Sequence, residues 1–522
     1  MLQSYVVEIH YSLSYQTPRN CHVNFASLPA THCSKHVGAQ VRSVIKRSLL
    51  LYILVVASIW LAGCARYQSV PLSPNQSAAG LESRSLSDPA LRDFVEEFSE
   101  RDVMVVPRIA KTNWPPAKWD LPTLTLVAFY YHPALDMARA QWNVAKAGVT
   151  TAGGRPNPVL SVVPGYSINP ASGVSPWLPL VSLDVPIETA GKRDYRIAHA
   201  QKVSDVARLN IASTAWQVRG NLRLSLLDWA SAQRRADLLQ HQLELQQQIL
   251  DLLEQRFRAG TVVRTDLTLA RVALARTSVD LADAARQSAE ARVRIADALG
   301  LTAKAIVGER FDFPLRVSPE ATEELTAAAA RQQALLGRAD ILAGLADYAA
   351  SESALQLEIA KQYPDVHLNP GYQFDQGEHK WSLGLSAELP VLNQNKGPIA
   401  EASARREEAA AHFTVLQAKV IGEIDRALAA RSSALEQLTN QIRLAKLASD
   451  QATAVQEMFD AGAADKLELS SAQLETAVTD LAELDAQIKA QQAIAQLEDA
   501  IQRPIEGWPS LERGRSAQAK SQ

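Results

Sequence analysis

Cysteine and the common catalytic signatures are what this chain has least of. Three cysteines occur in 522 residues (Cys21, Cys33 and Cys64), and the main body contains no CxxC spacing and no cysteine–histidine pair at zinc-ligand spacing. The phosphate-binding loop, the nucleophile elbow and the dinucleotide fingerprint are also missing. Without a recognisable set of nucleophile, base and acid, the sequence favours a protein that is not an enzyme and that needs no metal or other cofactor.

Charge and aromatic content are modest. Charged residues make up 21% of the chain with a net charge of −3, and aromatic residues make up 6%. No polybasic block points to a nucleic-acid partner. Ala, Leu, Gln and Glu dominate the long stretches instead, and this composition suits extended helices better than a compact aromatic core.

An export signal precedes residue 64. Basic residues within 42–47 come before the apolar run 49–57, and the string Leu61-Ala-Gly-Cys64 follows. This string resembles a bacterial lipobox, which implies cleavage before Cys64 and a diacylglycerol on its thiol. A transmembrane anchor is the alternative, although the apolar stretch is short for a bilayer span.

Residues 1–40 fit no targeting signal, because a basic region does not normally follow forty polar residues. We predict that they are a non-native or misassigned extension and that the precursor starts at Val41. The signal peptide then covers 41–63, and a lipidated tether rich in Ser, Pro and Gly covers 64–87.

The remaining chain contains the same unit twice. Pro158-Val-Leu-Ser-Val-Val-Pro-Gly-Tyr166 recurs as Pro364-Asp-Val-His-Leu-Asn-Pro-Gly-Tyr372, and Phe257-Arg-Ala-Gly260 recurs as Phe459-Asp-Ala-Gly462. The shared landmarks keep their order and nearly their spacing. The sequence therefore predicts two copies of one long unit rather than several unrelated domains.

Each copy contains two segments in which apolar and polar residues alternate. The alternation is nearly perfect in the second copy, over 365–375 and 380–390, and looser in the first, over 158–168 and 177–187. A period of two is typical of strands with one apolar face. Each segment has about the ten residues that a tilted strand needs to cross a bilayer.

Long helical stretches follow each pair of strands. Residues 192–257 and 396–459 are predicted to form the long helices, and 265–299 and 466–502 the helices that return beside them. The first stretch carries a near-heptad leucine stripe between residues 238 and 253, which favours coiled-coil-like packing.

The domain organisation follows from these segments. It comprises an N-terminal helix and linker at 88–131, a first repeat at 132–301, an inter-repeat linker at 302–333, a second repeat at 334–504 and a C-terminal tail at 505–522.

Four strands in one chain cannot close a membrane barrel, because membrane barrels begin at eight strands and lipid does not tolerate an open sheet edge. Three chains would supply twelve strands, an allowed even number, and the paired long helices would continue the barrel as a helical tube. The alternative is a soluble hairpin whose apolar face packs on a coiled coil.

Short strings along the chain carry a family resemblance. They are Arg155-Pro-Asn-Pro158, Asp184-Val-Pro-Ile-Glu-Thr-Ala-Gly-Lys-Arg193, Phe257-Arg-Ala-Gly260 with Asp266-Leu267, and Phe459-Asp-Ala-Gly462 with Glu468-Leu469. With these strings, the chain resembles the TolC-like outer-membrane efflux proteins over about 132–504. The Pro-x-Glu-x-x-Gly-Lys-Arg form is similar to the heavy-metal cation branch of that family.

The resemblance implies a mostly helical fold with β-hairpins. Three identical chains would form a 12-stranded outer-membrane β-barrel, with four strands from each chain, continued by a periplasmic α-helical barrel. Such a homotrimer is the passive exit duct of a tripartite pump and works with a periplasmic adaptor protein and an inner-membrane transporter of the RND type. We therefore expect a lipid-anchored protein of the bacterial outer membrane that extends into the periplasm and exports heavy-metal cations or drugs.

The resemblance also implies roles for the tips between the long and the returning helices. Gly260 and Asp266 in the first copy, and Gly462 and Glu468 in the second, are expected to shape the turns that contact the adaptor. The alternative is purely local, since glycine suits a helix C-terminus and an acidic residue suits the start of the next helix.

Charged residues near the tips predict a gate. Asp460 and Asp465, multiplied by threefold symmetry, would form acidic rings that attract cations, unless they are ordinary solvated charges. The first tip is basic and carries Arg256, Arg258 and Arg264, which we expect to latch the closed state through salt bridges between the tips.

The strand segments carry further candidates. Asp184 and Glu388 fall in the polar series and are expected to face the lumen. His367 and His379 are interpreted as lumen or loop residues rather than metal ligands. Trp381 is expected in an aromatic girdle at the edge of the bilayer.

Two other functions stay open at this point. One is the outer-membrane duct of a type I secretion system for polypeptides. The other is a lipid-anchored periplasmic coiled-coil scaffold without a pore.

Overall fold

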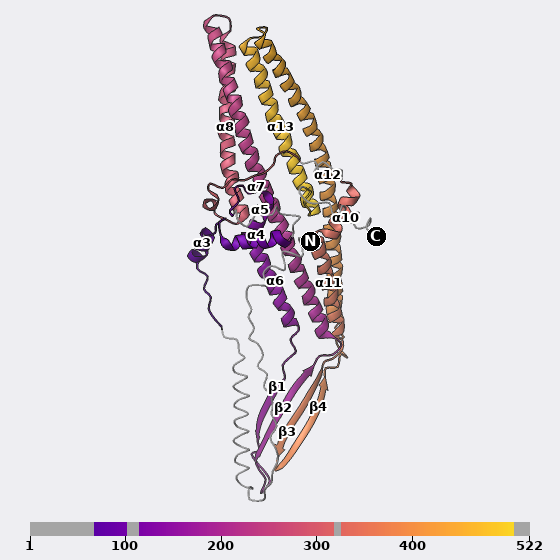
Figure 1. Ribbon diagram of the computed structural model, residues 1–522. Helices are drawn as coiled ribbons and strands as arrows, with labels where there is room; N and C mark the ends of the chain where they lie inside the picture. Colours follow the sequence, from indigo (N-terminus) through magenta and orange to yellow (C-terminus); the bar gives the residue numbers. More distant parts are fainter. Residues whose placement is uncertain (1–66, 102–113, 318–324, 506–522) are drawn as a thin grey trace, which may run out of the picture. The chain divides into compact units, whose positions relative to one another are not determined.

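The computed structural model describes residues 67–101, 114–317 and 325–505 (Figure 1). The predicted extension at 1–40, the signal peptide at 41–63 and the lipidation site Cys64 lie outside the described residues, as does the tail after residue 505.

The chain divides into two units, each described by itself. The described part of the smaller unit is 67–81, which contains most of helix α3 (Pro74–Glu82). The segment predicted as a tether therefore includes a short helix, none of whose residues is buried. The other described residues belong to the larger unit.

The larger unit repeats one order of elements (Figure 1). Before and within the first repeat the elements are α4 (Pro89–Arg101), α5 (Leu121–Tyr131), α6 (Pro133–Ala152), β1 (Val159–Tyr166), β2 (Trp177–Ile187), α7 (Lys192–Arg258) and α8 (Arg264–Leu299). After η1 (Ala303–Ile306) and α10 (Ala327–Gly337), the second repeat contains α11 (Ala339–Ala360), β3 (Val366–Asp375), β4 (Glu378–Ala387), α12 (Lys396–Asp460) and α13 (Lys466–Ile501).

The predicted elements are confirmed to within a few residues at each end. Helices α7 and α12 contain 67 and 65 residues, so each is about 100 Å long at 1.5 Å per residue. The predicted linker at 302–333 contains η1 and the first part of α10. Glu388 differs from expectation, because β4 ends one residue before it.

The four strands form one antiparallel sheet in the order β1-β2-β3-β4. The central pairing, β2 with β3, joins the two repeats, and Pro186 lies opposite His367 in its register. Large apolar side chains on the sheet are exposed, among them Leu160 at 64% and Leu385 at 72%. Within the described chain, β1 and β4 are the edge strands.

The buried core lies among the helices. The largest buried cluster joins the apolar helix α5 to α7 and α8 through residues such as Leu124, Leu222 and Ile295. A second cluster packs α10 against α12 and α13 around Ile424 and Leu497. The short helices thus cover the long ones where the returning helices end.

Among the described residues, no helix is both long enough and apolar enough to span a membrane.

Candidate functional site

The two helix tips have the same backbone conformation. Helix α7 is capped by Ala259 and α12 by Ala461, and the next residue in each case is a glycine with φ of +75° (Gly260 and Gly462). A residue other than glycine adopts this left-handed conformation only at a steric cost. The local explanation for both glycines is therefore satisfied by the geometry.

The second tip is stabilised by side chains. Asp465 is the N-cap of α13, and its carboxylate accepts hydrogen bonds from the backbone N–H groups of Leu467 and Glu468. Glu468 completes a capping box by accepting from the N–H of Asp465 at 3.0 Å. Glu468 thus has a structural role whether or not it contacts a partner.

The first tip lacks such a cap. The N-cap of α8 is Val263, which offers no side-chain acceptor, and Asp266 lies in the first helical turn. A carboxylate in that turn interacts favourably with the positive end of the helix dipole. Asp266 and Glu468 are therefore equivalent in sequence position but not in contacts.

One predicted contact between the tips is present in the structure. Arg256 of α7 donates a hydrogen bond to Asp465 of α13 at 2.7 Å. This hydrogen bond, followed by those from the backbone, lowers the pKa of Asp465, so the aspartate stays ionised at neutral pH. The structure brings together one arginine of the basic tip and one aspartate of the acidic tip.

The other charged tip residues lie apart from this pair. Asp460 ends α12 and accepts a hydrogen bond from Gln456, one turn earlier. Arg258 is strongly exposed, and its nearest carboxylate is Glu254 of its own helix at 3.8 Å. Arg264 begins α8.

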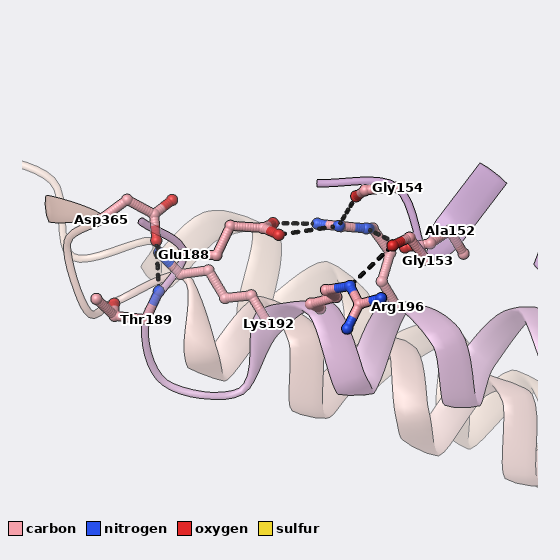
Figure 2. A network of polar contacts seen from close by, with 9 residues as sticks. Ala152, Gly153, Gly154, Glu188, Thr189, Lys192, Arg196 and Asp365 are labelled. Atoms are coloured by element: carbon pink, nitrogen blue, oxygen red, sulfur yellow. Dashed lines mark hydrogen bonds and ion pairs between the residues drawn. The ribbon is translucent and has the colours of Figure 1, made fainter. Parts of the chain in front are cut away.

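The string that resembles the heavy-metal branch forms the junction between β2 and α7 (Figure 2). Arg196 pairs with Glu188 at 2.5 Å and also donates to the carbonyl oxygens of Ala152 and Gly154 at 3.0 Å. Arg193 donates to the carbonyl of Gly153 at 2.8 Å. These bonds tie the end of α6 and the end of β2 to the first turns of α7.

The same junction reaches the second repeat (Figure 2). Asp365, just before β3, accepts from the buried Lys192 at 2.8 Å and from the backbone N–H of Thr189 at 2.9 Å. The Thr189 hydroxyl donates to the carbonyl of Pro364 at 2.6 Å. The bases of β2 and β3 are thus fastened by polar bonds as well as by strand pairing.

The second repeat makes its junction with fewer charges. Asn395 has a left-handed backbone (φ +56°) before α12, and its amide donates to the backbone carbonyl and the carboxylate of Glu358 in α11. The preceding loop exposes Leu389, Val391 and Leu392.

A buried charge cluster joins the repeats at mid-length. Glu498 of α13 is fully buried, pairs with Arg219 at 2.9 Å and with Arg223, and accepts from the N–H of Ile505 at 2.7 Å. Burial alone would raise the pKa of Glu498, but the two guanidinium groups outweigh it, and the net shift is downward. Arg223 also donates to Gln491 at 3.1 Å.

Sequence reasoning missed this cluster. The available signal was the spacing of Arg219 and Arg223, which places both on one face of a helix. Their carboxylate partner lies in the other repeat, and single-sequence patterns do not pair residues so far apart.

A polar cavity of about 680 Å³ lies beside the cluster, where α13 ends and α11 begins. Gly220 and Leu224 of α7 line this cavity. Leu222 lies on the opposite face of the same helix and packs in the core with α5. Asp499 also lines the cavity, and the protein around it raises its pKa to about 6 by desolvation.

A side-chain pair in the sheet that was not anticipated joins the two repeats. Asp184 of β2 accepts a hydrogen bond from His367 of β3 at 2.9 Å. The residues that the structure describes contain no group of three or more His, Cys, Asp and Glu side chains arranged to hold a metal ion.

The comparison with protein families bears on the first repeat. Residues 128–301, from the end of α5 to just beyond α8, match the family model described as "Outer membrane efflux protein".

A curated relative supports the same placement. The chain is 25% identical over 235 residues to the cobalt-zinc-cadmium resistance protein CzcC of Cupriavidus metallidurans. The alignment covers 44% of this chain and 53% of the relative, so the chain spans about half the length of the curated protein that it matches.

Solved structures share the efflux-protein fold over most of the chain. The outer-membrane channel OprN matches with a TM-score of 0.60 and 18% identity, covering 84% of this chain and 98% of the channel. CusC, described in terms of folding and transmembrane channel formation, matches with a TM-score of 0.60 and 18% identity, covering 76% of this chain and 97% of CusC. The family resemblance and the fold class predicted from the sequence are confirmed.

Proposed function

We propose that three copies of this chain form an exit duct through the bacterial outer membrane. The observation that carries the proposal is a four-stranded sheet with two edge strands, β1 and β4, and an exposed apolar face. Such a sheet is not viable alone in lipid, because its edge groups would be unsatisfied. Three sheets joined edge to edge form a closed barrel with an allowed number of strands.

The distribution of side chains on the sheet supports this arrangement. Two aromatic pairs, Tyr166 with Trp177 and Tyr372 with Trp381, have ring centroids 5.1 and 4.9 Å apart. Both pairs lie near the hairpin turns and on the same face as the exposed apolar residues. Aromatic side chains favour the boundary between hydrocarbon and headgroups, so we assign this end of the sheet to the outer boundary of the bilayer.

The lumen then lies on the other face of the sheet. The strand register places Asp184 on this face, and we propose Asp184 as a lumen residue. Glu388 lies beyond β4, and we place it at the periplasmic entrance of the barrel. The helices would continue the duct as a periplasmic tube, with the polar cavity beside Asp499 on its inner wall.

The partners and the anchor are proposed from the family resemblance and from the lipobox-like string before Cys64. We propose that a periplasmic adaptor binds the tips around Gly260, Asp266, Gly462 and Glu468, and that an inner-membrane transporter of the RND type supplies the energy. Acylation of Cys64 would add an anchor in the outer membrane. The duct itself would be passive, with no catalytic role and no cofactor beyond that lipid.

The substrate class that we favour is divalent heavy-metal cations. One support is the relative CzcC, which is named as a cobalt-zinc-cadmium resistance protein. The other is the sequence from Pro186 to Arg193 at the β2–α7 junction, which resembles the heavy-metal branch of the family. A drug conduit and a polypeptide secretion duct would share the fold and differ in the transporter. Identification of the transporter that co-purifies would separate them.

We propose that Asp460 and Asp465 form the periplasmic gate at the helix tips and that the Arg256–Asp465 ion pair holds the two tips of each chain together. Arg258 and Arg264 would add to the positive charge of the first tip. We also keep the predicted domain boundaries, with repeats at 132–301 and 334–504, as part of the proposal.

The duct is tested by conductance in planar bilayers. The full-length mature chain, extracted in detergent, is expected to form discrete ion-conducting channels that favour cations. A preparation that folds, runs as a single chain and never conducts would remove the duct and favour the scaffold.

The tip contact is tested on the same channels. Arg256→Gln removes the ion pair and leaves the capping box intact, so a larger fraction of open time is expected. Arg258→Gln is the matched control, because this side chain is exposed and forms its ion pair with Glu254 of its own helix. Equal opening of both variants and the wild type would show that the pair does not hold the tips together.

A further inference from the structure

The pairing of His367 with Asp184 has a fixed polarity. The Nδ1 atom of His367 lies 2.9 Å from Oδ1 and 3.1 Å from Oδ2 of Asp184. An ionised carboxylate only accepts hydrogen bonds, so Nδ1 carries the proton. The Nε2 atom of the neutral ring then keeps its lone pair free for another partner.

This is the arrangement found behind metal-binding histidines. A ligating imidazole usually donates its other N–H to a carboxylate, which fixes the tautomer and makes the ligand more basic. Both side chains are 39% exposed, so solvent reaches the pair. One imidazole of this kind suits borderline cations such as Zn²⁺ and Co²⁺ better than Mg²⁺, which prefers oxygen ligands.

The surroundings of the pair are polar. His367 lies opposite Ser386 of β4, and Asn369 of the same strand face donates to the Ser386 hydroxyl at 3.0 Å. Asp365 adds a second negative charge near the ring, but its carboxylate is engaged by Lys192. The pair is thus on the face opposite Leu368 and Leu385, which are register partners in the apolar series.

The other strand histidine provides an internal contrast. His379 of β4 lies on the apolar face, where its Nδ1 is 2.6 Å from the Tyr372 hydroxyl and its ring packs near Phe374. No carboxylate in the described chain is hydrogen-bonded to it.

We propose that His367 binds a divalent transition-metal cation through Nε2, with Asp184 as the carboxylate behind it, on the lumen wall of the barrel. The proposal rests on the duct function, because it assumes that this face lines the pore. It adds a ligand role to the interpretation of His367 as a lumen residue. With one histidine from each chain and water as the other ligands, binding is weak, and weak binding is what conduction requires.

The test is block of single-channel current by Zn²⁺ at neutral pH. His367→Gln is expected to raise the half-blocking Zn²⁺ concentration by about 10-fold or more, and Asp184→Asn by about 10-fold, the usual effect of losing a carboxylate behind a ligating histidine. His379→Gln is the matched control, and its half-blocking Zn²⁺ concentration should equal that of the wild type. Mg²⁺ at the same concentrations should not compete with Zn²⁺ block.

A second measurement needs no variant. Carbethoxylation of the wild-type oligomer, read by peptide mass spectrometry, should show Zn²⁺ protecting His367 and leaving His379 unprotected. Equal protection of both residues, or Zn²⁺ block unchanged in His367→Gln, would overturn the metal site while leaving a conducting duct intact. Absence of conductance in the wild type would instead count against the duct.

Discussion

The two repeats reverse their long helices with the same backbone but fasten their joints with different side chains. Gly260 and Gly462 have the same φ of +75°, and a Cβ added at either would meet no other atom within 4 Å. Where a chain must turn through the left-handed region, glycine is kept for its conformational freedom. The duplication therefore preserves the turn most faithfully.

The returning helices, α8 and α13, end beside the start of the helices that precede the hairpins, α6 and α11. The side-chain contacts at these two joints differ between the repeats. In repeat 1, the C-cap of α8 is Gly300 with φ +70°, and Arg84 donates to the carbonyls of Tyr131 and Gly300. In repeat 2, the C-cap of α13 is Gln502, and the buried Arg338 donates to the carbonyl of Ala500 and pairs with two carboxylates. An arginine bridges each joint, but only the second is part of an ion-pair network.

The largest expected effect comes from the cluster that joins the repeats. Glu498→Gln should lower the free energy of unfolding by about 3–5 kcal/mol, because Arg219 and Arg223 would lose the buried carboxylate that forms ion pairs with both of them. Thermal unfolding of the detergent-extracted protein measures this. Glu475→Gln, an exposed site on the same helix, should change little; equal effects would mean that the cluster does not hold the repeats together.

The next largest effects are expected at Arg338 and Arg84, the arginines that bridge the two joints. Arg338→Gln should cost about 2–3 kcal/mol, because Asp340 and Glu423 lose their charged partner in a partly buried site. Arg84→Gln should cost about 1 kcal/mol, since neutral carbonyls lose its hydrogen bonds. Chemical denaturation of both variants gives the difference, and a larger loss for Arg84→Gln would contradict the contrast between the joints.

Alanine substitutions at Gly260 and Gly300 separate the cost of steric crowding from the cost of a left-handed backbone. A Cβ on Gly300 would lie 2.7 Å from the Tyr131 carbonyl oxygen and 2.8 Å from His132 Cα, whereas Gly260 has open space. Both require the left-handed conformation, so Gly260→Ala should cost about 1 kcal/mol and Gly300→Ala about 2–3 kcal/mol. Gly462→Ala should match Gly260→Ala in melting temperature. If all three were equal, close contact at the first joint would not matter.

The smallest effect concerns pH. The pKa of Asp499 is about 6 in the folded protein, against 3.8 for an ordinary aspartate. Such a group is neutral in both states at low pH, and its ionisation destabilises the fold as the pH rises from 3.8 through 6. Asp499→Asn should therefore raise the free energy of unfolding at about pH 8, by roughly 1 kcal/mol or less after solvent screening, and should leave it unchanged at about pH 4. A small rise in melting temperature at the higher pH alone would show this. The opposite pH dependence would show that Asp499 is stabilised as an anion.

Much of the fold follows from local sequence signals. Alternation predicted the four strands, and Gly260 and Gly462 predicted the turns, because both signals depend on neighbouring residues only. The Arg256–Asp465 contact could be anticipated because the first tip is basic and the second tip is acidic. The Glu498 cluster and the His367–Asp184 pair could not, because no such contrast of charge marks their segments and their partners are set by helix packing and strand register.

The central claim is that the sheet of one chain is completed by two others. Native mass spectrometry of the full-length mature protein, extracted from membranes in mild detergent, tests it most directly. The account predicts an assembly of three chains, and Trp381 or Leu385 replaced by Asp on the exposed apolar face should reduce its yield. A stable single chain in detergent and in water, with the fold intact, would contradict it.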